Sequence, residues 1–307
     1  MNNFDFYNPT RIAFGEGKIA ALDTLVPADA KVLILFGGDS ARRTGTLSEV
    51  EAALGNRQVQ LFGGIEPNPS FETLMEAVTV VQRDGIDYLL AVGGGSVIDG
   101  TKFVAAASIF DGDAWDILLK GGTNIHRALP FGSVLTLPAT GSEMNKGAVV
   151  TRKSLQAKLP FHSEHVFPQF SVLDPTKSFT LPPRQVANGV VDAFVHIVEQ
   201  YLTYPASAPV QDRFAEGLLQ TLIDIGPQAL SDPENYSVRA DLMWVATLAL
   251  NGLIGAGVPQ DWATHMLGHE LTALHGLDQA QTLAIVLPAM LTERKDAKHG
   301  KLVQYAQ

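Results

Sequence analysis

The sequence predicts an α/β domain built on a parallel sheet, followed by an all-α domain, and three observations carry this prediction. Short apolar runs alternate with amphipathic stretches over residues 1–183. Three of those runs end in glycine or proline. Residues 184–307 show long helical periodicities and no convincing strand. We place the boundary at Pro182-Pro183, because proline suits the first turn of a helix and disfavours helix before it.

The strands of the first domain are predicted from apolar runs that do not alternate with polar residues. These runs are 31–36 (KVLILF), 88–92 (YLLAV) and 133–137 (SVLTL). Such runs are typical of strands buried on both faces, as in a parallel sheet covered by helices. Amphipathic stretches at 70–83 and 96–107 supply two of those helices. Strand, glycine turn, helix and strand in succession predict a doubly wound, Rossmann-like sheet.

The second domain is predicted from helical spacing of its apolar residues. Five helices are expected, at 185–202, 211–225, 238–254, 260–274 and 280–291. We find no internal repeat and no low-complexity segment in the chain.

Composition excludes several classes of function. The 307 residues contain no cysteine, which excludes disulfides, thiolate metal sites and cysteine nucleophiles and suits a reducing cytoplasm. A net charge of −10 argues against nucleic-acid binding, which needs a basic face. Residues 1–5 lack the basic and apolar regions of a secretory signal, and the apolar stretch 283–287 is too short to span a membrane. We therefore expect a cytoplasmic globular protein without membrane contact.

A glycine-rich loop follows the second predicted strand. Gly93, Gly94 and Gly95 lie between that strand and a helix start, and Ser96 is a good N-cap. Glycine lets a phosphate approach the backbone, and the helix N-terminus offers free N–H groups. Neither the G-x-G-x-x-G nor the P-loop spacing fits, so a plain strand-to-helix turn stays an alternative. Loops 37–40 and 138–143 follow the other two strands, and ligands of open α/β sheets bind at such strand ends.

Acidic and imidazole side chains recur at one-turn spacing in the second domain. Asp192 and His196 share one face of an apolar helix, and His265 and His269 share one face of another, with His275 beyond it. Buried charges need partners, and Asp with several His is typical of first-row metal sites. Two alternatives stay open: a structural Asp192–His196 pair, and hydrogen-bonded core histidines. A metalloprotease H-E-x-x-H motif fails at Ala273.

Taken together, these motifs resemble the iron-containing (group III) alcohol dehydrogenase family, in its NADPH-dependent aldehyde reductase and butanol dehydrogenase branch. The matching stretches are 62–69 (FGGIEPNP), 91–102 (AVGGGSVIDGTK), 135–143 (LTLPATGSE), 185–196 (QVANGVVDAFVH) and 257–269 (GVPQDWATHMLGH). The resemblance implies hydride transfer between NAD(P)H and aldehydes or primary alcohols, with Fe²⁺ or Zn²⁺ as Lewis acid, in a homodimer.

The resemblance also implies roles for individual residues. The pyrophosphate is expected at Gly94, Gly95 and Ser96, and the adenosine ribose at the loop Gly37, Gly38, Asp39 and Ser40. The remaining cofactor-binding residues are expected to be Asp99, Thr136, Thr140, Ser142 and Lys158. Asp192, His196 and His265 match three of four metal ligands, and His269 matches a histidine beside the substrate, where it is expected to act in catalysis.

Two departures from the family are visible. The fourth ligand should be a histidine fourteen positions after His265, where this chain has Gln279. An amide is a weaker, neutral ligand, so we expect a weakened or empty metal site that His275 could complete. The chain also stops inside a helical pattern, at residues 303–307, and the helical domain is expected to be truncated.

The preferred cofactor and the exact activity are open to alternatives. Asp39 could bind ribose hydroxyls and favour NAD(H), whereas Arg42 and Arg43 could receive a 2′-phosphate. The resemblance favours NADP(H). One alternative to an aldehyde reductase is another enzyme of the same fold, either a glycerol-type polyol dehydrogenase or a dehydroquinate-synthase-like lyase. A second alternative, suggested by Gln279 and by the expected truncation of the helical domain, is a non-catalytic dinucleotide-binding relic.

Overall fold

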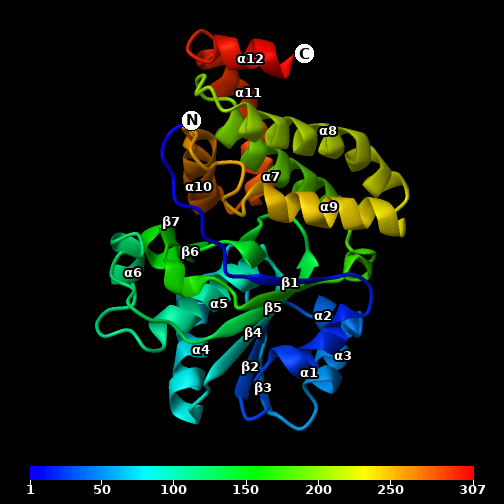
Figure 1. Ribbon diagram of the computed structural model, residues 1–307. Coiled ribbons are helices and arrows are strands. Elements are labelled where there is room, and N and C mark those ends of the chain that lie inside the picture. The colour runs from blue at the N-terminus through cyan, green and yellow to red at the C-terminus, as the bar shows by residue number, and fades with distance from the viewer. The chain divides into compact units, whose positions relative to one another are not determined.

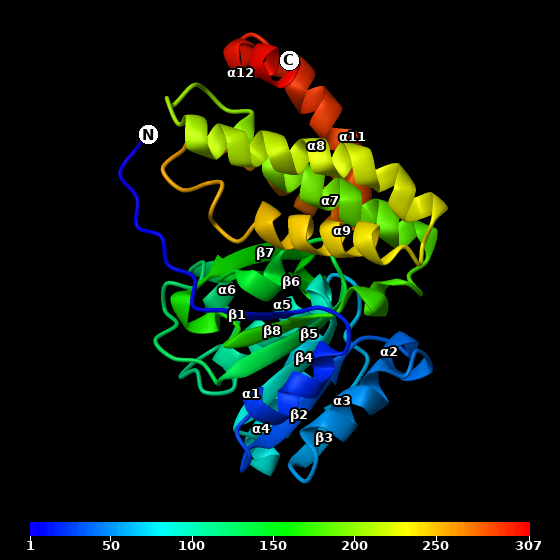
Figure 2. The ribbon, with the colours of Figure 1, turned by 45° about the vertical axis from the view of Figure 1, so that its right-hand side comes forward.

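The computed structural model describes residues 1–307 and divides into two compact units, which we describe separately (Figures 1 and 2). The sheet unit comprises Pro9–Leu137 and Ser142–Thr180. The helical unit comprises Met1–Asn8, Pro138–Gly141 and Leu181–Gln307. Two short segments that precede the Pro182-Pro183 pair thus belong to the helical unit.

The sheet unit is built on six parallel strands in the order β1-β8-β5-β4-β2-β3. Their bounds are β1 Arg11–Phe14, β2 Lys31–Phe36, β3 Gln58–Phe62, β4 Tyr88–Gly94, β5 Phe131–Leu137 and β8 Phe170–Leu173. The three predicted strands are the central β2, β4 and β5, which are buried along nearly their whole length. Sequence patterns missed β1, β3 and β8. β1 and β8 have only four residues each, and β3 is a half-exposed edge strand.

Helices cover the two faces of this sheet (Figure 1). Their bounds are α1 Leu22–Leu25, α2 Ser40–Arg43, α3 Thr46–Leu54, α4 Phe71–Asp84, α5 Gly95–Ala107 and α6 Asp116–Leu119. Val32 and Ile34 of β2 pack in one core cluster with Leu47 and Val50 of α3. Successive strand residues point to opposite faces, so the equally buried Leu33 lies on the face that α4 and α5 cover. Burial on both faces explains why the central strands are uniformly apolar.

An antiparallel hairpin that the sequence patterns did not predict packs against α5. It consists of β6 Gly147–Arg152 and β7 Ala157–His162, with Thr151 opposite Lys158. Its turn contains Gln156 at φ 48, in the left-handed region. Five 3₁₀ turns complete the unit: η1 Lys18–Ala21, η2 Ser142–Met144, η3 Lys153–Leu155, η4 Glu164–Val166 and η5 Pro175–Ser178.

The helical unit contains six helices and no strand. They are α7 Pro183–Tyr201, α8 Pro209–Ser231, α9 Tyr236–Ala249, α10 Ala263–His275, α11 Gln279–Glu293 and α12 His299–Tyr305. The five predicted helices are α7 to α11, although α9 ends five residues before the predicted end at residue 254. None of these helices combines the length and the apolar run that crossing a lipid bilayer requires.

Local signals fix where the helices that matter for the site begin and end. Pro183 occupies the first turn of α7, where its missing N–H costs nothing. Helix α10 ends at Gly276, whose φ of 68 is the left-handed C-cap that glycine adopts without strain. Two residues later, Asp278 and Gln281 form a capping box that starts α11, so Gln279 is the first residue of that helix.

Candidate functional site

The glycine-rich loop of the sheet unit leaves little room for side chains at Gly93 and Gly94. A Cβ atom on Gly93 would lie 2.6 Å from Cγ2 of Val97, and one on Gly94 would lie 3.0 Å from Cβ of Leu137. Helix α5 begins at Gly95 directly after β4, and no side chain caps its N-terminus. Its first N–H groups and its dipole therefore suit a phosphate group, as the sequence predicts.

Asn68, a residue that the sequence analysis did not single out, links two predicted cofactor residues. Its backbone N–H donates to Oγ of Ser96 (3.3 Å), and its Oδ1 accepts from Nζ of Lys158 (2.8 Å). Asn68 also has a φ of 55, which few residues other than glycine adopt. The structure thus brings Ser96 of α5 and Lys158 of β7 to one place, although 61 residues separate them in the chain.

Polar contacts anchor the buried side of α5. The Asp99 carboxylate accepts from Oγ of Ser142 (2.6 Å) and from the N–H of Val149 (2.9 Å). Lys102 is fully buried and donates through Nζ to Oδ1 of Asn145 (2.9 Å) and to the carbonyl of Gly147 (2.7 Å). Burial lowers the pKa of Lys102 to about 8, partly offset by the charge of Asp99. These contacts tie α5 to the η2 turn and to strand β6 of the hairpin.

The other predicted cofactor residues lie on or after strands next to β4. Thr136 is on β5, which pairs with β4. Gly37, Gly38, Asp39 and Ser40 follow β2, the other neighbour of β4, and the Gly37 carbonyl accepts from the N–H of Gly64 (2.8 Å). Thr140 lies in Pro138–Gly141, a segment of the helical unit that passes so close to α7 that a Cβ on Gly189 would lie 2.3 Å from the Pro138 carbonyl oxygen.

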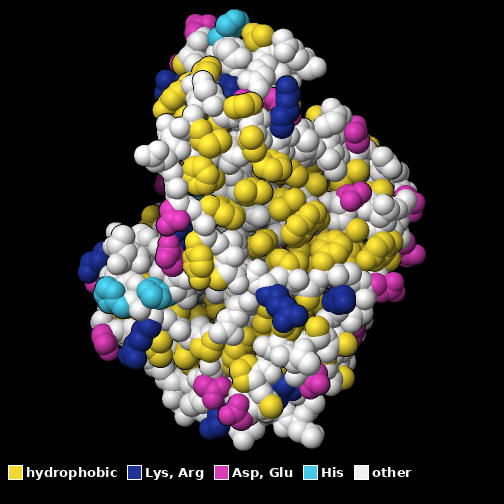
Figure 3. All heavy atoms as spheres, viewed as in Figure 1, with side chains coloured by type: hydrophobic (Ala, Val, Ile, Leu, Met, Phe, Trp, Pro, Cys, Tyr) yellow, Lys and Arg dark blue, Asp and Glu magenta, His cyan; other side chains and the backbone are white.

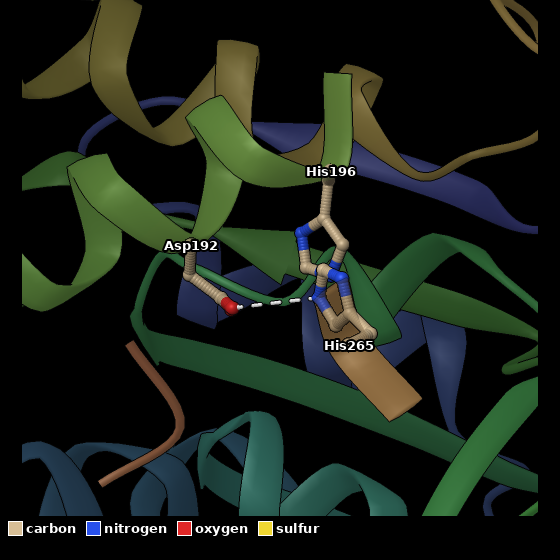
Figure 4. A group of neighbouring side chains, drawn as sticks. All are labelled: Asp192, His196 and His265. Carbon is tan, nitrogen blue, oxygen red and sulfur yellow. Dashed lines mark ion pairs between the residues drawn. The ribbon is translucent and has the colours of Figure 1, made fainter. Parts of the chain in front are cut away.

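In the helical unit, Asp192, His196 and His265 form a buried group (Figure 4). Asp192 and His196 come from α7 and His265 from α10, and one ligand atom from each lies within 4.8 Å of the others. Oδ1 of Asp192 is 4.0 Å from Nε2 of His265. The two imidazole rings are stacked, with centroids 4.6 Å apart and planes 19° apart. Trp262 meets both rings edge-on.

Two atoms of this group have no hydrogen-bond partner within the chain: Nδ1 of His196 and Nε2 of His265. Leaving a buried polar atom unpaired costs about 1–3 kcal/mol, so such atoms indicate a ligand from outside the chain. Burial lowers the pKa of His196 to about 4, which keeps the ring neutral at pH 7. One carboxylate and two imidazoles fit a divalent first-row metal ion with open coordination positions.

The structure also places the other residues around this group. Gln279 donates through Nε2 to Oδ1 of Asp192 (3.1 Å). The residue that replaces the expected histidine therefore lies at the site, where it donates a hydrogen bond to the Asp192 carboxylate. His269 is buried one turn after His265, with its ring nearly perpendicular to that of His265. His275 is exposed at the end of α10 and does not belong to the group.

Glu199 is a buried carboxylate beside the group that the sequence analysis missed. It lies on α7 and is hydrogen-bonded to Nδ1 of His265. Its spacing, three residues after His196 and seven after Asp192, places it on the same face of the helix. That spacing was visible in the sequence, but no further ligand was expected there.

Comparisons with known proteins decide which family this arrangement represents. Residues 9–175 match the family described as iron-containing alcohol dehydrogenase, and residues 186–307 match the C-terminal region of the same family. The chain belongs to the iron-containing alcohol dehydrogenase family. It is 64% identical to the NADPH-dependent aldehyde reductase YqhD of Escherichia coli, over 100% of this chain and 80% of that protein. It is 41% identical to a probable NADH-dependent butanol dehydrogenase of Bacillus subtilis, with the same coverage.

Solved structures of this dehydrogenase family show the same fold. A crystal structure of E. coli YqhD superposes with a TM-score of 0.99, covering 99% of this chain and 79% of that one. A butanol dehydrogenase of Thermotoga maritima, 37% identical, gives 0.95 and covers 98% and 76%. The predicted fold class, the family resemblance and the prediction of an alcohol dehydrogenase-type oxidoreductase are thereby confirmed, and they are favoured over the lyase, polyol dehydrogenase and relic alternatives.

Proposed function

We propose that this dehydrogenase is a metal-dependent aldehyde reductase, which transfers hydride from NADPH to aldehydes and, in reverse, from primary alcohols to NADP⁺. The observation that carries the proposal is the buried carboxylate–imidazole group with two ring nitrogens that have no partner within the chain. The 64% identity to a protein named as an NADPH-dependent aldehyde reductase supports the direction and the substrate class.

In this proposal Asp192, His196 and His265 hold Fe²⁺ or Zn²⁺. The ion, when bound, supplies a Lewis acid for the carbonyl oxygen of the aldehyde. The hydrogen bond of Gln279 to Asp192 supports a role for its amide in orienting that carboxylate rather than in binding the ion. With three protein ligands instead of four, we expect metal affinity to be lower than that of a site with a fourth histidine.

The proposed cofactor residues bind and orient NADPH. The N–H groups of Gly95 and Ser96 at the start of α5 would bind the pyrophosphate, and the missing N-terminal side-chain cap of this helix supports that role. Along the rest of the cofactor we place Gly37, Gly38, Asp39, Ser40, Asp99, Thr136, Thr140, Ser142 and Lys158.

The preference for NADPH is proposed from the loop that follows β2. Arg42 lies over the ring of Phe36, 4.9 Å from its centroid, at the end of that strand. Both Arg42 and Arg43 are exposed and able to pair with a 2′-phosphate. Asp39 is also exposed there and would act against that phosphate by charge repulsion. The ratio of kcat/KM for NADPH to kcat/KM for NADH measures whether the two arginines or Asp39 decide the cofactor preference. We expect this ratio to exceed one.

His269 is proposed as the residue that handles the proton of the product alcohol. It is buried on the same helix as His265 and lies one turn further on, outside the three-residue group. We expect His269→Ala to lower kcat and to change its pH dependence, while the metal content stays unchanged. An unaltered rate and pH profile would remove His269 from the mechanism.

A homodimer and a cytoplasmic location remain predictions. Apolar side chains gather on the face of the helical unit that Figure 3 shows. Exposed apolar residues of this unit include Ile223 of α8, Leu267 and Leu274 of α10 and Ile285 of α11. Extended apolar surface favours association. Light scattering on the purified chain measures its oligomeric state.

The experiment that tests the proposal follows NADPH oxidation by purified protein loaded with iron or zinc, with a medium-chain aldehyde as substrate. A chelator-stripped sample is the control, and His275→Ala is the matched variant, because His275 is exposed and outside the group. We expect chelator-sensitive turnover that metal restores. Folded protein that binds NADPH but does not reduce the aldehyde would refute the activity, and full turnover after stripping would refute the metal site.

A further inference from the structure

The buried carboxylate of Glu199 is satisfied by three donors, all from the start of α10. Its Oε1 accepts from the N–H groups of Thr264 (2.6 Å) and His265 (3.3 Å), and its Oε2 is hydrogen-bonded to Nδ1 of His265. The side chain is almost completely buried. A buried carboxylate is tolerated only when it is hydrogen-bonded in this way. Both oxygens of the carboxylate thus have a partner in α10.

Glu199 also supplies a cap that α10 otherwise lacks. The N-cap residue of α10 is Trp262, which makes no side-chain capping hydrogen bond. Glu199 of α7 accepts from two N–H groups in the first turn of α10 instead. A negative charge there is also favoured by the helix dipole. The position of α10 is thereby coupled to the helix that carries Asp192 and His196.

The contact with Nδ1 determines which nitrogen of His265 carries the proton. An ionised carboxylate only accepts hydrogen bonds, so Nδ1 of His265 must be the donor. In a neutral imidazole the other nitrogen then has a free lone pair. That nitrogen, Nε2, has no hydrogen-bond partner and lies 4.0 Å from Oδ1 of Asp192. The free lone pair is therefore on the nitrogen that lies 4.0 Å from Asp192, and not on the nitrogen that is bonded to Glu199.

We propose that Glu199 is a positioning residue: it holds His265 as the Nδ1–H tautomer, with Nε2 ready to bind the metal ion beside Asp192 and His196. This inference rests on the metal site of the proposed function. Glu199 acts through His265 and contacts neither substrate nor ion. Outer carboxylates that orient a ligating histidine typically contribute 10–100-fold to metal affinity.

The substitution Glu199→Gln separates this role from the capping role. The amide oxygen of Gln can still accept from the N–H groups of Thr264 and His265. Its NH₂ group, however, would face Nδ1 of His265 as a donor and favour the Nε2–H tautomer. Nε2 would then carry a proton where the ion needs a lone pair. Glu199→Asp keeps the charge and serves as the second variant if Glu199→Gln does not fold.

The test measures Zn²⁺ affinity by competition with a chelator, and the tautomer by ¹⁵N NMR of histidine-labelled, metal-free protein. For Glu199→Gln we expect a 10–100-fold loss of affinity and a switch of the His265 signals from the Nδ1–H to the Nε2–H pattern. Glu199→Asp should keep the Nδ1–H pattern. The matched control is Glu216→Gln on α8, which accepts hydrogen bonds from Tyr201 and Gln304 and should leave both readouts unchanged.

The outcomes separate this inference from the proposed function. If the wild type binds no Zn²⁺, or if His196→Ala binds it equally well, the proposed metal site is wrong. The NMR experiment still tests the tautomer in that case. If binding depends on His196 and His265 but Glu199→Gln keeps wild-type affinity and the Nδ1–H pattern, only the role of Glu199 is wrong.

Discussion

Two buried polar sites, one in each unit of this dehydrogenase, are stabilised differently. In the sheet unit, the buried Lys102 finds both of its acceptors, Asn145 and Gly147, inside the chain. In the helical unit, His196 and His265 are equally buried, and each has a ring nitrogen with no partner in the chain. The internal partners of Lys102 serve the fold, whereas the unpaired nitrogens of two neighbouring imidazoles beside a carboxylate indicate a ligand. Substitution of Lys102 should therefore change stability, and substitutions in the carboxylate–imidazole group should change metal binding.

The largest effect is expected from removing a ligand of the proposed metal site. His196→Ala should lower aldehyde reduction by about a thousandfold or more, exceeding the 10–100-fold typical of residues that act through a ligand. Because the variant removes a buried group with an unpaired nitrogen, it should not unfold the protein. Metal content and turnover, measured on the same sample, check this. An active, metal-loaded His196→Ala variant would break the comparison between the two units.

Substitution of Lys102 should lower stability and leave metal binding unchanged, which is the opposite of the effect expected for His196→Ala. Lys102→Met leaves two buried acceptors, Oδ1 of Asn145 and the carbonyl of Gly147, without their donor. We expect a loss of about 3 kcal/mol in unfolding free energy, with Zn²⁺ affinity unchanged. Urea unfolding monitored with and without Zn²⁺ measures both quantities. A variant that loses Zn²⁺ affinity but no stability would show that the units cannot be separated in this way.

A gain of metal affinity is expected from Gln279→His. Gln279 is the first residue of α11 and already reaches Oδ1 of Asp192, so an imidazole at this position starts from the right place. We expect Zn²⁺ affinity to rise about 10–100-fold. Chelator competition measures the change, with Ala284→His at an exposed position of the same helix as the control. Equal affinity of Gln279→His and wild type would mean that three ligands already satisfy the ion.

The sequence was sufficient to predict the parts of the molecule with strong local patterns. Continuous apolar runs marked β2, β4 and β5, and one-turn spacing marked Asp192 and His196 on α7. The hairpin β6–β7 was missed because its strands are neither uniformly apolar nor strictly alternating. The pairing of Lys158 with Thr151 could therefore not be predicted from the sequence.

Pairings between distant segments could not be predicted either. Glu199 and His265 lie 66 residues apart, and only the packing of α7 against α10 shows that one carboxylate caps a helix and contacts an imidazole. Asn68 is a second example of such a pairing, because it joins Ser96 to Lys158 from a loop with no regular sequence pattern. Both are polar residues whose partners are set by tertiary structure rather than by local propensity.

The smallest predicted effect concerns the pH dependence of stability. Burial holds the pKa of Lys102 at about 8 in the folded chain, below the ordinary value of 10.5 that applies to the unfolded chain. Below pH 8 both states carry the proton, and the cost of burying the charge is constant. Above pH 8 the folded chain loses the proton first, so the unfolded chain binds more protons and stability rises with pH. At pH 9.5 wild type should gain about 1–2 kcal/mol relative to Lys102→Met, compared with pH 7. Urea unfolding of both proteins at the two pH values measures this difference, and a constant difference would mean that Lys102 stays charged in the folded chain.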